Sequence, residues 1–293
     1  MMDMPSPQES TPRSNAAELR SLSPQALRQV IRRQDHTGPT MGLAPGYLQG
    51  NLAILPQAQA FDFLLFCQRN PKPCPIIGLA EAGAVNLPEL GQDIDIRSDL
   101  PAYRVFRNGI PQQTVADLDA LWREDLVSFV IGCSFSFEEA LEEAGIPLRH
   151  LQAGSNVPMY RTSISTVPAG AFSGPLVVSM RAFPSWDAIH AILLSDRFRL
   201  AHGAPVHIGE PAQIGIKDLD TPDFGDPPYM EEGDIPVFWA CGVTPQLALR
   251  HCGADLAITH APGHMLVTDL PSSAAEARLS GLSSFRPSDS PNP

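Results

Sequence analysis

Two histidines and an aspartate stand close together in the stretch THAPGHMLVTD, residues 259–269. The four-residue spacing of His260 and His264 resembles two metal ligands on a helix face, but the Pro-Gly pair between them predicts a turn. Imidazoles beside a turn can face one pocket, where a near-neutral pKa suits proton transfer. We therefore predict an acid–base turn first. A divalent cation held by His260, His264 and an acid, or solvent-facing histidines, are the alternatives.

A second cluster occurs in HGAPVHIGEP, which contains His202, His207 and Glu210. On a strand, His207 and Glu210 would face opposite sides, so they converge only if Gly209 bends the chain. With such a bend they can supply a second proton-transfer group.

Cys133 and Cys241 each follow an apolar run. A helix that begins there would lower the thiol pKa and favour a nucleophilic thiolate. The competing interpretation is a small buried hydrophobic residue, which we favour for Cys67, Cys74 and Cys252. The five cysteines form no CxxC pair, so the sequence encodes neither a zinc ribbon nor a disulfide framework.

Three similar units position these residues: LVSFVIGCSFSFEEALEEAG, PLVVSMRAFPSWDAIHAILLS and IPVFWACGVTPQLALRHCGA. Each reads as a strand, a turn and a helix, and we expect Ser136, Ser185 and Thr244 to begin the helices. Helix N-termini offer N–H donors to carboxylates, although ordinary packing explains any single turn. The candidate substrate-binding residues are Ser134, Ser136, Thr244 and Gln246.

The first half of the chain contributes a Gly- and Pro-rich segment, TGPTMGLAPGYLQGN, residues 37–51. It has no periodic apolar face, so packing or a ligand must order it. We predict a binding loop, with Tyr47 as its candidate substrate contact. Before it, Ser23 and Pro24 predict a helix start, and after it Asn108-Gly109 predicts a hairpin.

These elements predict an α/β fold with a mixed sheet and repeated strand-turn-helix units. We expect residues 21–270 to form one domain, and a division of that domain into two lobes, 21–125 and 126–270, is the alternative. The Ser- and Pro-rich ends, 1–20 and 271–293, are expected to be mobile tails.

Net charge and hydropathy limit the kinds of partner that this chain is expected to bind. The 293 residues include 20 Lys and Arg against 32 Asp and Glu, a net charge of −12 that argues against nucleic acid. Apolar runs are too short for a membrane helix, and the first residues lack a signal-like apolar region. We expect a cytoplasmic protein that acts on a small molecule, with a mitochondrial location as the alternative and a homo-oligomer left open.

Five segments together resemble a known family: TGPTMGLAPGYLQGNLAILP, IGCSFSFEEAL, HGAPVHIGEP, VFWACGVTPQ and THAPGHMLVTD. They are similar to the bacterial putative hydro-lyase family, related to mitochondrial D-glutamate cyclase, over residues 27–270. The resemblance implies a carbon–oxygen lyase, with reversible cyclisation of D-glutamate to 5-oxo-D-proline and loss of water as its best-defined activity. A hydroxy-acid dehydratase and a noncatalytic carboxylate-binding protein are the alternatives.

Cyclisation needs a base, oxyanion donors and a proton for the leaving oxygen. We expect His260 or His264 to be the base and His207 or Glu210 to protonate the oxygen. Amides near the four turn residues would hold carboxylates, and no cofactor is required. In a thioester variant Cys241, or with less support Cys133, attacks the γ-carboxyl first.

Overall fold

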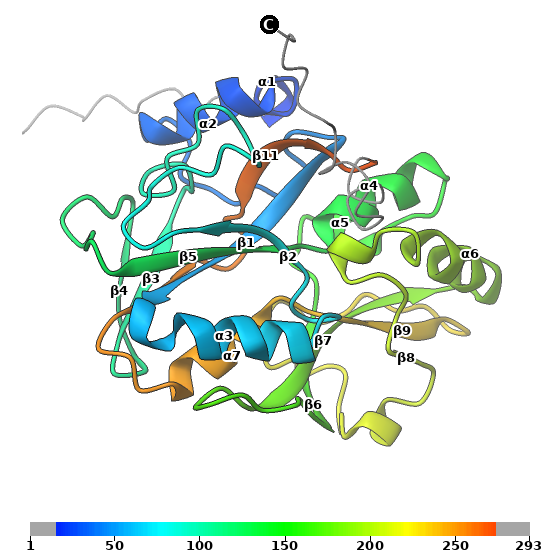
Figure 1. Cartoon of the computed structure of the whole chain (residues 1–293). Coiled ribbons are helices and arrows are strands. Elements are labelled where there is room, and N and C mark those ends of the chain that lie inside the picture. The colour runs from blue at the N-terminus through cyan, green and yellow to red at the C-terminus, as the bar shows by residue number, and fades with distance from the viewer. Residues whose placement is uncertain (1–15, 274–293) are drawn as a thin grey trace, which may run out of the picture.

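The computed structural model describes residues 16–273, in which helices pack around two sheets (Figure 1). The larger sheet has the order β2-β5-β1-β10-β3-β4, and β11 also pairs with β1. Its strands are β1 (Tyr47–Pro56), β2 (Ile76–Ala80), β3 (Tyr103–Arg107), β4 (Ile110–Val115), β5 (Leu126–Gly132), β10 (Ala257–His260) and β11 (Leu266–Pro271).

The smaller sheet has the order β6-β7-β9-β8. Its strands are β6 (Met159–Ser165), β7 (Pro175–Phe183), β8 (His207–Ile208) and β9 (Ile235–Ala240). The helices are α1 (Ala16–Arg20), α2 (Pro24–Arg32), α3 (Gln57–Arg69), α4 (Phe135–Glu143), α5 (Arg149–Gln152), α6 (Ser185–Ser195) and α7 (Val243–His251), with 3-10 turns η1 (Arg199–Ala201) and η2 (Pro211–Ile214).

The α/β class and the three strand-turn-helix units, β5–α4, β7–α6 and β9–α7, are confirmed. The expected mixed sheet needs correction, because the pairings between these strands are all antiparallel. In the smaller sheet β9 inserts between β7 and β8 and runs opposite to both. Strands β5, β10 and β11, which follow residue 125, belong to the larger sheet together with β1 to β4.

Local signals placed some helix starts correctly and others a residue or two late. Ser23 caps α2 by accepting from the Ala26 N–H, as predicted. However, α4 begins at Phe135 and α7 at Val243, so Ser136 and Thr244 lie inside the first turns. Their hydroxyls bond to neighbouring strands instead of capping.

Strand β1 carries an interruption along one edge. Its other edge pairs with β5 without a break from Gly50 to Pro56. On the interrupted edge, β10 pairs at Ala53 and Ile54, whereas β11 pairs at Tyr47, Gln49 and Gly50. The turn between β10 and β11, residues 261–265, therefore lies beside residues 51 and 52, where the two ladders leave a gap.

Helices α3 and α7 lie along one face of the larger sheet (Figure 1). Phe63 of α3 packs against Phe129 of β5, edge to face, with ring centroids 4.9 Å apart. The opposite face is covered by the irregular segment 81–100, whose Leu87, Leu90 and Ile96 are buried. Burial on both faces makes the sheet a rigid support for side chains at its edges.

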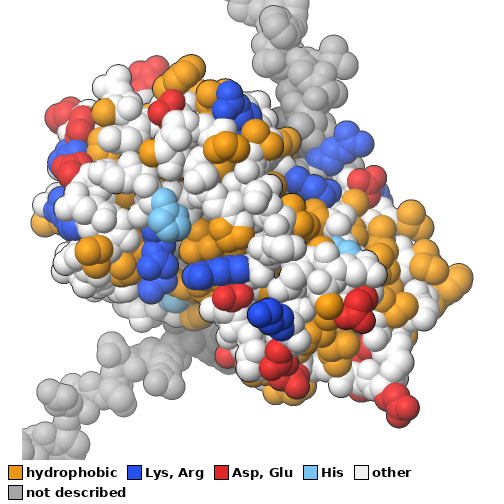
Figure 2. Space-filling model, turned by 90° about the horizontal axis from the view of Figure 1, so that it is seen from below, with side chains coloured by type: hydrophobic (Ala, Val, Ile, Leu, Met, Phe, Trp, Pro, Cys, Tyr) orange, Lys and Arg blue, Asp and Glu red, His pale blue; other side chains and the backbone are white. Residues whose placement is uncertain are grey.

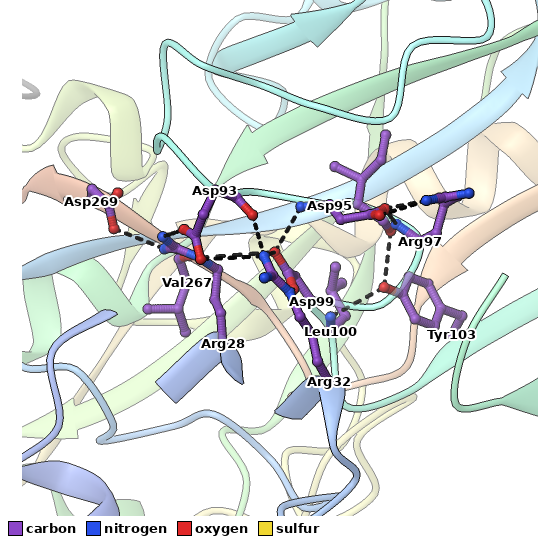
Figure 3. A network of polar contacts seen from close by, with 11 residues as sticks. Arg28, Arg32, Asp93, Asp95, Arg97, Asp99, Leu100, Tyr103, Val267 and Asp269 are labelled. Atoms are coloured by element: carbon purple, nitrogen blue, oxygen red, sulfur yellow. Dashed lines mark hydrogen bonds and ion pairs between the residues drawn. The ribbon is translucent and has the colours of Figure 1, made fainter. Parts of the chain in front are cut away.

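A polar network joins α2 to segment 91–100 and β11 (Figure 3). Arg28 is fully buried, forms ion pairs with Asp93 and Asp269 and donates to the Val267 carbonyl. Arg32 pairs with the buried Asp99. The network fixes α2 over the strand that follows the histidine turn.

The chain ends only partly match the expected tails. Residues 16–20 of the predicted N-terminal tail form α1, and Leu19 is buried against α2. Residues 1–15 and 274–293 lie outside the described residues.

On the face in Figure 2, Lys and Arg side chains lie among acidic and apolar ones. No helix within residues 16–273 is long and apolar enough to span a membrane.

Candidate functional site

A cavity lies where the strand-turn-helix junctions β5–α4 and β9–α7 meet the interrupted edge of β1. The histidine turn and the end of η1 complete its wall. No Lys, Arg, Asp or Glu side chain lines this cavity in the described part of the chain. Its polar side chains are Asn51, Cys133, Ser134, Asn156, His202, Cys241, Gln246 and His260.

His260 fills the gap in the ladder of β1. Its Nδ1 lies 3.2 Å from the Leu52 nitrogen and 3.4 Å from the Leu52 oxygen, while its Nε2 lies 3.0 Å from the Gln246 side-chain nitrogen. The residue is 1% exposed, and burial lowers its pKa to about 4. His260 is therefore a neutral imidazole at pH 7, held at both ring nitrogens.

His202 faces the same cavity from the end of η1. Its Nδ1 lies 2.9 Å from the Lys72 carbonyl oxygen, and the residue is 2% exposed. Burial lowers its pKa to about 4, and the charges of Arg181 and Lys72 act in the same direction. Its backbone is left-handed, with φ +77°, a conformation that is uncommon for residues other than glycine, although asparagine, aspartate and histidine adopt it more often than the rest.

Cys133 and Cys241 occupy equivalent places, each at the end of a strand and just before a helix. Each sulfur accepts from the N–H two residues later, Phe135 or Val243, which lowers the thiol pKa. Burial outweighs this effect and raises the pKa to about 12 for Cys133 and about 11 for Cys241. The expected depressed thiol pKa is thus wrong, and both thiols are protonated at neutral pH.

A glycine beside each cysteine leaves space for another cavity residue. A Cβ on Gly132 would lie 1.6 Å from the Leu200 carbonyl oxygen, so the missing side chain lets η1 approach β5. A Cβ on Gly242 would lie 2.4 Å from the Asn51 side-chain nitrogen. The approach at Gly132 brings η1, which precedes His202, against the end of β5, and the approach at Gly242 places the Asn51 side chain against the turn that follows Cys241.

Two helix N-termini border this space. Within residues 16–273 the N–H groups of Ser134 and Gly242 have no hydrogen-bond acceptor, and both residues line the cavity. They stand at the N-termini of α4 and α7, where the helix dipole is positive. Such N–H groups are suited to a carboxylate or a developing oxyanion.

A buried ion pair supports one wall. Arg181, 3% exposed, pairs with Glu138 and donates to the Ser134 hydroxyl at 3.1 Å. Its guanidinium lies 5.1 Å from the Phe137 ring centroid. Although burial opposes ionisation of Glu138, Arg181 and His150 hold the pKa of its carboxyl low, at about 2. The charge on Arg181 is thereby compensated behind the cavity wall.

The structure brings together part of the predicted site. His260, Cys133, Cys241, Ser134 and Gln246 all line the cavity. The remaining predicted residues are outside its lining: His264, His207, Glu210, Ser136, Thr244 and Tyr47.

The residues outside the cavity have other contacts. His264 is half-buried and bonds to the Pro262 carbonyl at 2.8 Å. His207 bonds to the Glu210 carbonyl, while the Glu210 carboxylate caps η2. Tyr47 lines a separate pocket with Glu139.

Buried hydroxyls and the Gly/Pro segment serve packing contacts. Thr244 Oγ1 accepts from the Val177 N–H at 2.9 Å. In the Gly/Pro segment, Thr40 bonds to Gly263 and Met265, so this segment supports the histidine turn. Of the residues 37–51, Asn51 lines the cavity.

Sequence reasoning did not select His202, Asn51 or Asn156. His202 was visible only as the first histidine of HGAPVHIGEP, and the adjacent Gly203 was its one local signal.

The described residues contain no group of three or more His, Cys, Asp and Glu side chains placed to hold a metal ion.

Comparison with known proteins locates the chain among relatives. The model of the D-glutamate cyclase family matches residues 127–269. A putative hydro-lyase of Bordetella pertussis is 63% identical over 234 residues, covering 80% of this chain and 84% of the relative. One from Stutzerimonas stutzeri is 53% identical over 256 residues, covering 87% and 97%. One from Methylobacterium radiotolerans is 57% identical over 243 residues, covering 83% and 90%.

Proposed function

This chain belongs to the putative hydro-lyase family that is related to D-glutamate cyclase, and from that premise we propose that it cyclises D-glutamate reversibly to 5-oxo-D-proline and water. The observation that carries the proposal is the cavity itself. Among residues 16–273, neutral imidazoles and helix N-terminal N–H groups without a hydrogen-bond acceptor meet there, and no charged side chain lines the space.

The reaction moves two protons from nitrogen to oxygen. The substrate ammonium loses one proton before its nitrogen attacks the γ-carboxyl carbon, and a second when the amide forms. The departing oxygen gains both and leaves as water. A neutral imidazole can accept a proton and return it as imidazolium. Two such rings, those of His260 and His202, line the cavity.

The two carboxylates of glutamate need separate partners. The Ser134 and Gly242 N–H groups stand at two different helix N-termini, so each can hold one carboxylate, and the one at the reacting carbon stabilises the oxyanion. Bound carboxylates also raise the pKa of nearby imidazoles, since a negative charge favours the protonated ring.

The covalent variant through Cys241 demands an additional proton transfer, because its thiol pKa is about 11. Direct attack by the amine avoids that step. We therefore propose the direct route, with the thiols as apolar wall.

The test is a proton NMR time course of the purified full chain with D-glutamate, L-glutamate and each 5-oxoproline enantiomer, with and without chelator. Interconversion confined to the D pair supports the proposal, and equal rates in chelator argue against a metal requirement. No interconversion in any tube refutes the cyclase. A parallel panel of hydroxy acids then tests dehydration, and dicarboxylate binding without turnover would favour a noncatalytic binding protein.

A further inference from the structure

We propose that His202 is the general base of this site, with its Nε2 accepting the proton from the amine of the substrate. The inference rests on the proposed function and adds a catalytic residue to it. It is carried by the position of the ring in the cavity wall and by the single hydrogen bond that fixes its tautomer.

The tautomer follows from the partner of Nδ1. A carbonyl oxygen only accepts hydrogen bonds, so the Nδ1 atom that lies 2.9 Å from the Lys72 oxygen must carry the proton. In the neutral ring Nε2 is then unprotonated. No hydrogen-bond donor reaches Nε2 among the described residues, so its lone pair is available to the cavity.

His202 and His260 differ in the hydrogen-bond partners of their ring nitrogens. The Nε2 of His260 is already bonded to the Gln246 side chain, and its Nδ1 has both backbone groups of Leu52 within reach. The Gln246 side-chain nitrogen only donates hydrogen bonds, so it occupies the Nε2 lone pair of His260 and leaves the ring proton on Nδ1. His202 has one tautomer and one free nitrogen, which suits a group that first accepts a proton.

The backbone also indicates that the position of His202 is built for this contact. Its left-handed conformation turns the chain sharply after η1, and the bare Cα of Gly132 admits η1 against β5. Both features place a 98%-buried imidazole in the cavity wall.

The proton balance is closed by His202 and the substrate. His202 Nε2 takes a proton from the ammonium, the amine nitrogen forms a bond to the γ-carbon, and the carbonyl electron pair moves to oxygen. The imidazolium returns its proton to the oxygen that leaves when the carbon–oxygen bond breaks. His202 Nε2, neutral again, then accepts the second nitrogen proton and passes it to the same oxygen, and no oxidant or cofactor takes part.

His202→Asn is the decisive variant. Asparagine tolerates the left-handed backbone, and its Nδ2 can replace Nδ1 as donor to the Lys72 carbonyl, but it has no counterpart of Nε2. We expect kcat for D-glutamate to fall by about 100-fold or more. The affinity for 5-oxo-D-proline, measured calorimetrically, should stay within about threefold, because the helix N–H donors remain. The matched control is His251→Asn, an exposed histidine at the end of α7, with kcat within about twofold of wild type.

A measurement on the wild-type protein covers the case in which His202→Asn does not fold. Long-range ¹⁵N–¹H NMR of histidine-labelled protein at pH 7 should show the His202 ring neutral and protonated at Nδ1. A ring protonated at Nε2, or at both nitrogens, overturns the inference. So does a folded His202→Asn protein that turns over D-glutamate like the wild type. A wild type without turnover overturns the proposed function, and the inference with it.

Discussion

Replacing Glu138 by glutamine would leave the guanidinium of Arg181 buried without its counter-charge. The two side chains are 3% and 2% exposed, so water cannot compensate. Removing one partner of a buried pair costs about 3–5 kcal/mol. Depression of the Glu138 pKa from 4.5 to about 2 gives a similar figure, about 3 kcal/mol at about 1.4 kcal/mol per pKa unit. We expect Glu138→Gln to lower the free energy of unfolding at pH 7 by about 3 kcal/mol.

The pH dependence makes this prediction specific. Because the folded pKa lies below the unfolded one, the stabilisation is present above pH 4.5 and is lost as the pH falls through about 2. The difference between wild type and variant should therefore be about 1 kcal/mol smaller at pH 4 than at pH 7.

Urea unfolding followed by tryptophan fluorescence and circular dichroism provides the measurement, with coincident transitions as the check on two-state behaviour. Glu143→Gln, at the exposed end of the same helix, is the control and should change stability by less than about 0.5 kcal/mol. A loss below about 1 kcal/mol for Glu138→Gln, or a difference that does not vary with pH, would refute the reasoning.

Three further predictions concern the cavity. Gly132→Ala should displace η1, because the new Cβ would meet the Leu200 carbonyl. We expect the free energy of unfolding to fall by about 2 kcal/mol or more in the same urea assay. A variant with wild-type stability and activity would contradict this packing. Cys241→Ser should retain turnover within about tenfold, and its loss beyond that in a folded protein would favour the thioester route. His202 and His260 must be neutral to act, and each has a pKa of about 4. We therefore expect kcat/KM to stay constant as the pH is lowered from 8 to about 5, and to fall below about pH 4. A decline already at pH 6.5 would show a pKa near that of free imidazole.

Signals confined to a few neighbouring residues were sufficient for several elements. Ser23 and Pro24 predicted the start of α2, and Asn108-Gly109 predicted the β3–β4 hairpin, where both residues have positive φ. These features follow from capping hydrogen bonds and from the backbone freedom of individual residues. The three strand-turn-helix units were equally visible, because the hydrophobic period changes within each of them.

The sequence by itself therefore determined the elements, the thiols at two strand ends and the histidine turn. Tertiary structure decided how strands pair and which histidine faces the cavity, since His202 reaches it through the space at Gly132 while His207 lies on β8 outside it. It also decided the direction of the thiol pKa shifts, because burial by distant segments outweighs the local helix N–H groups. Pairing and burial depend on contacts between residues far apart in the chain, and no short pattern encodes them.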